Sequence, residues 1–302
     1  MAEVQRVRLL GAMVQEVAEH GAANVSVASV VARSGVSRRT FYELFDDRDA
    51  CFLAAFDDAL RGVSSVVVPA YSAEHGRWQE RIRGGLVALL DCLEHDRQTA
   101  RLLIVESLAA GPRMLTRRQE TLAPLIAAVD EGRRGQAGGR AEPPPLTAQG
   151  IVGGALSLLH DRLIEGDQAS LLELTGALMA MIVAPYLGQA AARKEIAKPT
   201  PTPSDNGPVL HASDSLRELP IRLTYRTAMT LSAIADAPGA SNRHIGEIAH
   251  IADQGQASKL LNRLQRYGLI ENTGTGAKGE ANAWTLTPTG QDVHNTITNA
   301  HT

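Results

Sequence analysis

Apolar residues recur at intervals of three and four along the first twenty positions. Val7, Leu10, Val14 and Val17 follow this spacing, and the pattern stops at Gly21. A stripe with the period of an α-helix predicts an amphipathic first helix, and glycine is common just beyond a helix C-terminus. We therefore expect the chain to begin with one long helix that buries one face.

Two shorter helices are expected next, separated by a tight turn. Ser26 is a suitable N-cap for the first of them, and Gly35 ends it. Ser37 then caps a further helix that runs through Phe45. Two short helices around a glycine-containing turn are the geometry of a helix-turn-helix, whose second helix enters the major groove of DNA.

Residues 49–197 predict helix after helix, with two long helices at the end of this region. Breaks are expected near Pro69, near Gly76, at Gly111 with Pro112, over 132–145 and near Gly166. The last two helices, at about 146–165 and 169–187, carry wide apolar stripes. Such stripes need a partner surface, which is either the core of the same chain or a second copy of it.

The run KPTPTPSDNGPVLHASD, residues 198–214, has no apolar period and is rich in proline and serine. Alternating proline and threonine favours an extended, semi-rigid spacer over a packed segment. We expect a linker here, and a separate C-terminal domain over residues 215–302.

Helical patterning resumes after the linker. One helix is expected to end at Pro238 and Gly239, a second to be capped by Asn242 and a third by Asp253. The third helix has an apolar face and a face of hydrogen-bond donors without a carboxylate. That polar face consists of Ser258, Lys259, Asn262, Arg263 and Arg266.

Two short strands are expected beyond the third helix. They lie in GLIEN from Gly268 and in AWTLT, on either side of a glycine-rich loop with Lys278 at its tip, and a last helix begins near Pro288. A cation at the tip of such a loop can meet a phosphate or the minor groove of DNA.

Composition supports a mainly helical, folded protein. Aromatic residues make up 4% of the 302 residues and hydrophobic residues 44%, which favours helices packed through aliphatic stripes. Cys51 and Cys92 are too few for a disulfide framework, and no Cys/His cluster offers zinc four ligands. Neither a secretory leader nor a membrane span is indicated, so a cytoplasmic location is expected.

The net charge of -3 means that any basic surface must be local. Residues 1–214 carry 22 Lys and Arg against 26 Asp and Glu, whereas residues 215–302 carry 8 against 7. Nonspecific affinity for nucleic acid should therefore be modest.

The stretch SVASVVARSGVSRRTFYELFDDRDACFLAAF, residues 26–56, resembles the TetR family of bacterial regulators. Gly35, Val36 and Ser37 match the family's turn, and Arg48 stands where a basic residue opens the fourth helix. The resemblance implies a DNA-binding domain over residues 1–48 and a helical ligand-sensing and dimerisation domain over 49–197. It also implies a homodimer that pairs through the helices near 146–165 and 169–187, where Gly153, Gly154 and Ser157 permit close approach.

The resemblance places the expected DNA contacts on and around the third helix. Hydroxyls of Thr40 and Tyr42 suit phosphate oxygens, as does the cation of Arg48, whereas Arg38 and Arg39 are candidates for reading bases. Arg39 departs from the family, in which this position is commonly small. The expected contact residues of this domain are Ser37, Arg38, Arg39, Thr40, Tyr42 and Arg48. The alternative is a plain helical hairpin with Arg38 and Arg39 on a solvated face.

The C-terminal region resembles the winged helix-turn-helix of MarR-like regulators, through its order of helices and strands. The resemblance implies a second DNA reader that uses Ser258, Lys259, Asn262, Arg263 and Lys278. MarR-like proteins dimerise through long terminal helices that this chain does not have room for. The alternative is a winged helix that contacts protein instead of DNA.

Enzyme motifs are missing from the sequence. It contains neither a GxSxG nucleophile elbow nor a Walker loop, HExxH or a dinucleotide glycine fingerprint. We expect no enzyme and no cofactor.

The hypothesis is a transcriptional repressor that binds double-stranded DNA at a palindromic operator and is released by a small-molecule effector. Candidate lining residues for an effector cavity are Trp78, His95, Arg101, Met114 and His160.

Overall fold

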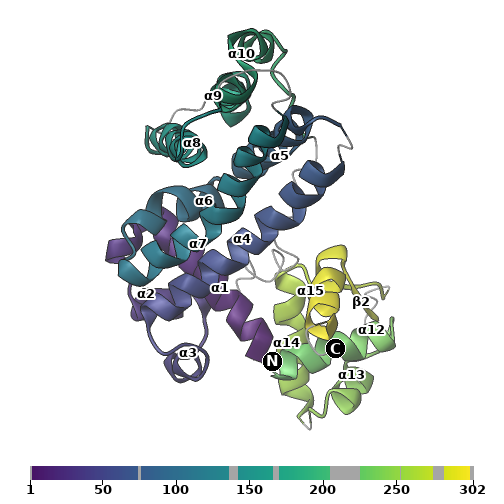
Figure 1. Ribbon diagram of the computed structural model, residues 1–302. Coiled ribbons are helices and arrows are strands. Elements are labelled where there is room, and N and C mark those ends of the chain that lie inside the picture. The colour runs from purple at the N-terminus through teal and green to yellow at the C-terminus, as the bar shows by residue number, and fades with distance from the viewer. Residues whose placement is uncertain are drawn as a thin grey trace. The chain divides into compact units, whose positions relative to one another are not determined.

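The computed structural model describes residues 2–73, 76–135, 142–165, 170–204, 225–251, 253–274 and 282–299. Contacts divide the chain into two compact units. The first comprises Met1–Ala12, Ser26–Arg48 and Ala212–Thr302, and the second comprises Met13–Val25 and Asp49–His211. The described chain is mainly helical, as expected from its aliphatic periodicity (Figure 1).

The N-terminal helices follow the predicted boundaries closely. The first helix ends at His20, and Gly21 has a left-handed φ of 78°. A short 3-10 turn then leads to the two short helices. These elements are α1 (Ala2–His20), η1 (Ala22–Asn24), α2 (Val27–Ser34) and α3 (Arg38–Leu44).

The second unit is a bundle of helices in which α4 and α5 pack against each other. Val63 of α4 and Cys92 of α5 share one buried cluster. The helices and short turns of this region are α4 (Arg48–Ala73), α5 (Trp78–His95), α6 (Arg97–Ala100), η2 (Arg101–Val105), η3 (Glu106–Leu108), α7 (Pro112–Asp130), η4 (Glu131–Gly135), α8 (Thr147–Ile164), η5 (Leu171–Leu174), α9 (Thr175–Leu187) and α10 (Gln189–Ile196).

The predicted break near Pro69 is wrong, because α4 continues through Pro69 to Ala73. The last turn is held by Tyr71, whose hydroxyl donates to Glu131 at 3.2 Å. The guanidinium of Arg81 also lies 4.9 Å from the centre of the Tyr71 ring. These contacts compensate for the backbone hydrogen bond that proline cannot donate.

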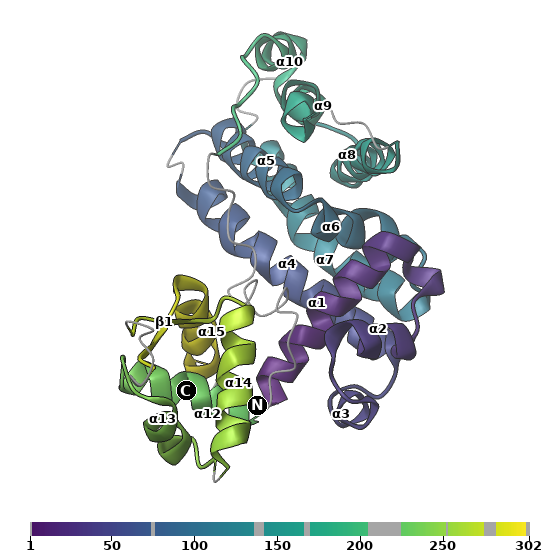
Figure 2. The same cartoon turned by 180° about the vertical axis from the view of Figure 1, so that it is seen from behind.

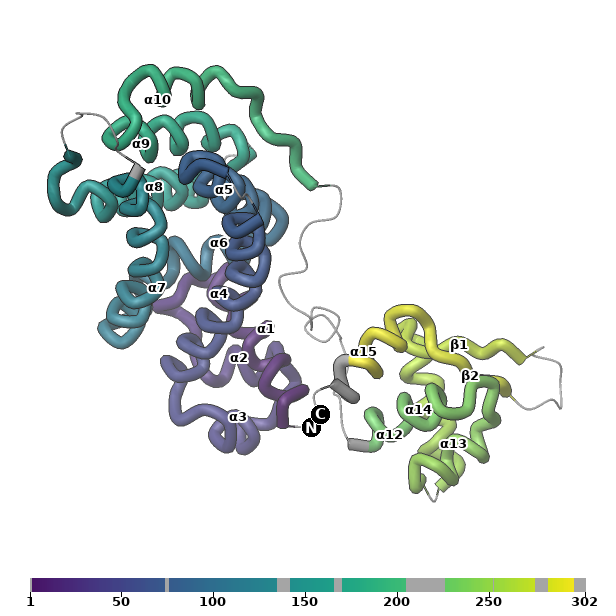
Figure 3. Tube along the Cα trace, turned by 45° about the vertical axis from the view of Figure 1, so that its right-hand side comes forward, coloured from purple at the N-terminus to yellow at the C-terminus, as the bar shows by residue number. Residues whose placement is uncertain are grey.

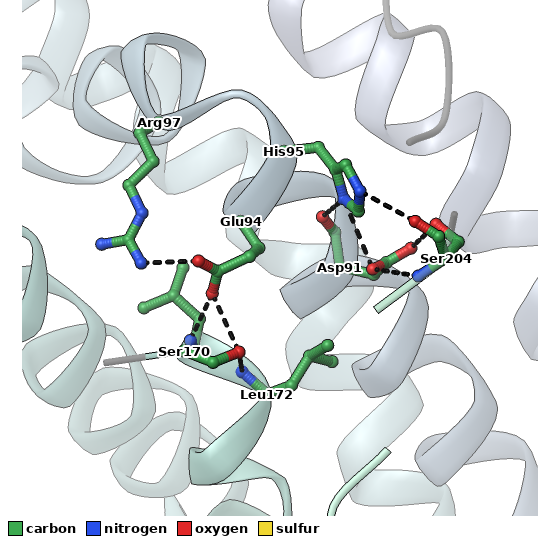
Figure 4. A network of polar contacts seen from close by, with 8 residues as sticks. Asp91, Glu94, His95, Arg97, Ser170, Leu172 and Ser204 are labelled. Atoms are coloured by element: carbon green, nitrogen blue, oxygen red, sulfur yellow. Dashed lines mark hydrogen bonds and ion pairs between the residues drawn. The ribbon is translucent and has the colours of Figure 1, made fainter. Parts of the chain in front are cut away.

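The helix expected from residue 169 begins later, at Thr175. A 3-10 turn, η5, precedes it and is anchored by Glu94 of α5. The Glu94 carboxylate accepts hydrogen bonds from Ser170 Oγ at 3.2 Å and from the Leu171 N–H (Figure 4). The Leu171 N–H is thus satisfied by a side chain from another helix, and the Leu172 N–H donates to Ser170 Oγ at 3.3 Å.

Helices α8, α9 and α10 lie together at one end of the second unit, with α10 packed on α9 (Figures 1 and 2). The core between α7, α8 and α9 is built from Val129, Ile151, Val152, Met179 and Val183. Much of the predicted apolar stripe is therefore used inside the chain. None of the described helices is both long and apolar enough to cross a membrane.

The C-terminal region contains four helices and a small antiparallel sheet within its described residues (Figure 3). Ile270 pairs with Leu286 and Asn272 with Trp284, and Ala240 adds an isolated bridge to Trp284. The elements are α12 (Tyr225–Asp236), α13 (Asn242–Ile248), α14 (Gln254–Arg266), β1 (Ile270–Asn272), β2 (Trp284–Leu286) and α15 (Pro288–Asn299).

Candidate nucleic-acid interface

Local hydrogen bonds fix both ends of α2, and the residue types at those ends predict them. Ser26 Oγ accepts from the Ser29 N–H at 3.1 Å, and Ser29 Oγ accepts from the Ser26 N–H at 3.2 Å. At the other end of α2, Gly35 has a left-handed φ of 64° and donates its N–H to Val31. Because L-residues with a side chain rarely adopt this conformation, glycine permits the abrupt change of direction into α3.

The orientation of α3 is fixed by one inward ring. Phe41 is fully buried, and its ring lies 5.7 Å from that of Phe45, which is buried as well. Arg6 of α1 stacks over the Phe45 ring at 5.8 Å. Phe45 is therefore a core residue, and the opposite face of α3 is directed to solvent.

The exposed face of α3 carries two arginines and a tyrosine. Tyr42 is 50% exposed, so it is not a core aromatic residue. The guanidinium of Arg38 lies 6.0 Å from the Tyr42 ring centre. Among the residues that the structure describes, no carboxylate pairs with Arg38. Its guanidinium therefore keeps its planar set of donors for an external acceptor.

Arg39 is in a different situation from Arg38. Its Nε donates to Glu43 at 2.9 Å, one helical turn along α3, and both side chains are largely exposed. Such a surface pair contributes about 0 to 1 kcal/mol, so DNA can displace it easily. Until that happens, Glu43 neutralises Arg39 and orients it.

Ser37 and Thr40 form a hydroxyl pair at the start of α3. Ser37 Oγ accepts from the Thr40 N–H at 3.1 Å, and the two hydroxyl oxygens are 2.8 Å apart. One of the two O–H groups is used between them, which leaves the other for an acceptor such as a phosphate oxygen. Arg48 is the first residue of α4 and is partly buried.

The polar face predicted for the C-terminal domain lies on α14. Lys259, Asn262, Arg263 and Arg266 are all exposed. Ser258 differs from them, because it is partly buried and its Oγ accepts from the Asn242 Nδ2 at 3.1 Å. Lys278 lies outside the described residues.

Asn242 is a structural residue that the sequence pattern misassigned. The N-cap of α13 is Ser241, whose Oγ accepts from the His244 N–H at 3.3 Å. The Asn242 Oδ1 instead accepts from Trp284 Nε1 at 2.5 Å and from Asn282 Nδ2 at 3.2 Å. Since its Nδ2 donates to Ser258, Asn242 joins α14 to β2. The N–H of a buried tryptophan requires such an acceptor. The presence of Trp284 in the sequence was therefore the signal that could have pointed to this role of Asn242.

The candidate cavity residues of the helical region are distributed over separate contacts. Trp78 Nε1 donates to the Ala128 carbonyl at 2.8 Å, and Met114 is fully buried. His160 lies beside Asp161, with 3.3 Å between Nδ1 and Oδ1. The structure does not bring these residues together around one described cavity.

Arg101 belongs to a chain of contacts that the sequence pattern did not reveal. Its Nη1 donates to the Leu163 carbonyl near the end of α8 at 3.0 Å, and its Nη2 lies 3.5 Å from Glu106. Glu106 is buried and accepts the N–H of Ala22 at 2.8 Å. The segment between α1 and α2 is thereby connected to the end of α8 through two side chains.

One group of side chains has the spacing of metal ligands. Glu16, Glu19 and His20 of α1 place ligand atoms within 4.8 Å of one another. Glu16 is already paired with His20 at 3.8 Å. Exposed acidic groups often lie together without an ion, so we assign no metal site here.

Comparison with known proteins supports the geometry of the N-terminal elements. Residues 9–55 match the model of bacterial regulatory proteins, tetR family. This segment is thus similar to the N-terminal domain of the tetR family. It spans η1, α2 and α3 and includes most of α1, and the exposed face with Arg38 and Tyr42 lies within it. No curated protein matches the chain.

Solved structures show a related fold. The chain is similar to the fatty acid degradation regulator FadR from Bacillus halodurans, with 18% identity, a TM-score of 0.52 and coverage of 59% of this chain and 94% of that one. It is also similar to FadR from Bacillus subtilis in complex with stearoyl-CoA, with 16% identity, a TM-score of 0.52 and coverage of 60% and 98%. About 60% of this chain thus has a fold similar to that of these two FadR structures.

Proposed function

We propose that this chain is a transcriptional repressor that binds a palindromic operator as a homodimer through α3. The observation that carries the proposal is the exposed face of α3 within the matched segment, where Arg38 has no carboxylate partner among the described residues. A guanidinium presented from the start of a recognition helix can make a bidentate contact with a guanine edge, worth about 1 to 3 kcal/mol. Arg39 adds a second contact once Glu43 is displaced.

The test is selection of genomic fragments by the purified full-length protein, followed by affinity measurements on the selected site. Replacing both Arg38 and Arg39 with alanine should weaken binding to that site at least tenfold and leave affinity for unrelated DNA within a few-fold. The matched control replaces Arg193 and Lys194 of α10, two exposed cations, and should not change affinity. Equal binding of the operator by wild type and by the α3 variant would refute base reading by α3.

The dimer is proposed to form through α8 and α9. On α8, a Cβ added at Gly150 or Gly153 would meet no atom within 4 Å. Leu158 and Ile164 of the same helix are 46% and 53% exposed. A helix with open glycines and exposed apolar side chains is suited to close packing against a second copy. Gly153→Arg should convert the dimer to a monomer in light-scattering measurements, and Arg193→Ala should not.

A small molecule that binds the helical region is proposed to release the DNA. The contacts from Leu163 through Arg101 and Glu106 to Ala22 would connect a change at α8 to the segment before α2. Stearoyl-CoA is a reasonable first effector to test, because the similar B. subtilis protein was solved in complex with it. Loss of operator binding on its addition would support an acyl-CoA effector.

The C-terminal domain is proposed to be a winged helix that serves as a second DNA reader. Support comes from the order α12, α13, α14, β1, β2 and from the exposed Lys259 and Arg263 on α14. Truncation before Leu216 should shorten the footprint and weaken binding. An unchanged footprint and affinity would favour the alternative, in which this domain contacts protein.

A further inference from the structure

The chain that leaves α10 lies along α5. Thr202, Pro203 and Ser204 line a groove together with Val87 and Asp91 of α5, while they themselves stay exposed to solvent. The preceding Lys198 is also fixed, because its Nζ lies 2.6 Å from the buried Glu195. Residues 198–204, the part of the predicted spacer that the structure describes, are mostly exposed, and they are held at Lys198 and Ser204. Residues 205–214 lie outside the described chain.

Ser204 is bound through three of its own atoms (Figure 4). Its N–H donates to Asp91 Oδ1 at 3.2 Å, and its Oγ donates to Asp91 Oδ2 at 2.5 Å. Its carbonyl oxygen lies 3.1 Å from His95 Nε2. Two donors meet the carboxylate and one acceptor meets the imidazole, so Asp91 and His95 together recognise the backbone and side chain of one serine.

The hydrogen bonds of His95 select the charged ring. Nδ1 lies 2.8 Å from the Asp91 carbonyl oxygen, while Nε2 faces the Ser204 carbonyl oxygen. Carbonyl oxygens only accept, and a neutral imidazole has a single N–H. Both contacts are satisfied together only by the doubly protonated ring. In a neutral ring, one nitrogen would direct a lone pair at an oxygen.

The charged groups around His95 also favour its protonated form. The hydrogen bond to the Asp91 carbonyl raises the pKa of His95, burial opposes this, and the Asp91 carboxylate, the Ser204 carbonyl and Glu94 raise it further. The Asp91 carboxylate lies 3.4 Å from Nδ1. The neighbouring cation, Arg97, is engaged by Glu94 at 2.7 Å. Among the described residues, the charged groups that face His95 are thus acidic.

We propose that Asp91 and His95 form a proton-controlled clasp that docks residues 202–204 in the α5 groove and releases them when His95 loses its proton. The next described anchor along the chain is Lys198. Release therefore frees six more residues of the connection to α12, which can span about 20 Å when extended. Because the folded pKa is raised, docking is complete below the ordinary histidine value and is lost as pH rises through the folded value.

The test measures the clasp directly, in the full-length protein without DNA. Amide hydrogen exchange of Ser204, corrected for the intrinsic rate, is followed by NMR between about pH 5.5 and 8.5, on either side of the ordinary histidine value. The His95 ring is titrated in the same samples. The Ser204 amide should lose at least tenfold of its protection with the same midpoint as the His95 titration. Protection that does not follow that midpoint would overturn the proposal.

Three variants separate the clasp from general folding effects. His95→Ala should expose the Ser204 amide even at the acidic end. Asp91→Asn should move the His95 midpoint to lower pH, because an anion beside the ring is removed. The control His160→Ala, at another histidine beside a carboxylate, should leave Ser204 unchanged. Unchanged protection in His95→Ala would also overturn the proposal. Because DNA is absent, these results do not depend on the proposed function.

Discussion

The buried carboxylate of Glu106 accepts the N–H of Ala22 at 2.8 Å, across 84 positions of sequence. Ala22 directly follows Gly21, whose left-handed φ ends α1. A single side chain therefore secures the segment that leads into the helix-turn-helix. Glu106 is held in turn by Arg101, which also reaches the Leu163 carbonyl.

Glu106→Ala should lower the free energy of unfolding by about 1 to 3 kcal/mol, because the buried Ala22 N–H loses the carboxylate that accepts its hydrogen bond. Thermal unfolding followed by circular dichroism measures the loss. The control Glu173→Ala, at an exposed position of η5, should change stability by less than about 0.5 kcal/mol. Equal effects of the two substitutions would show that the Ala22 contact contributes nothing.

Glu195 should make stability depend on acid pH. Burial alone would raise its pKa, but hydrogen bonds from Lys198 and Gln79, with the charges of Lys198 and Arg83, lower it below the ordinary value. The stabilisation is therefore present above the unfolded pKa and is lost as pH falls through the folded one. Glu195→Gln should cost about 2 kcal/mol at neutral pH, less than for a fully buried pair, since Lys198 reaches solvent.

The measurement is the difference in melting temperature between wild type and Glu195→Gln over a range of pH. The difference should be largest near neutrality and should shrink below the ordinary glutamate value of about 4.3. A difference that stays constant into acid would contradict the assigned role of the ion pairs.

The thiol of Cys92 should be inert in the native protein. Burial, with a contribution from Asp91, raises its pKa to about 11. Thiolate is the reactive form, so both burial and charge suppress modification near neutral pH. In a Cys51→Ala background, a disulfide reagent should label the native chain far more slowly than the chain unfolded in denaturant. Comparable rates in the two states would contradict this.

Asn242→Ala should destabilise the C-terminal domain by about 1 to 3 kcal/mol, because the buried Trp284 Nε1 loses its acceptor. Unfolding is followed by Trp284 fluorescence in a Trp78→Phe background. Asn262→Ala, at an exposed position of α14, is the matched control and should have little effect.

Lys259 and Arg263 should contribute to the salt dependence of DNA binding. If each neutralises one phosphate, replacing both with alanine should reduce the slope of log affinity against log salt by about 2. Filter binding or fluorescence anisotropy over a salt series gives the slope. A slope equal to that of wild type would place α14 away from the DNA backbone.

The helix-turn-helix was predictable from sequence because its determinants are local. Ser26, Gly35 and Ser37 act on backbone groups no more than four residues away. Capping and the left-handed turn therefore follow from residue type and spacing alone. The strands over GLIEN and AWTLT and the helix from Pro288 were predictable for the same reason, since their signals are short-range.

Other features required contacts between distant parts of the chain. Local rules predict a helix break at Pro69 and an N-cap at Asn242. Instead, Tyr71 holds the turn of α4 that follows the proline, and the Asn242 side chain accepts a hydrogen bond from Trp284. Each error arose where a partner distant in sequence offered a better hydrogen bond or ring contact than the local one.

The sequence by itself determined the helical class, the helix-turn-helix and the residues expected on the exposed face of α3. Only the tertiary structure decided that Arg39 is paired while Arg38 is not, that Glu106 holds Ala22, and that Ser204 is docked on α5 by Asp91 and His95. The physical reason is the separation in sequence between the groups that interact. Helix period and caps depend on neighbours within one turn, whereas the Ser204 contact spans 113 positions and exists only once α5 and the segment after α10 have packed together.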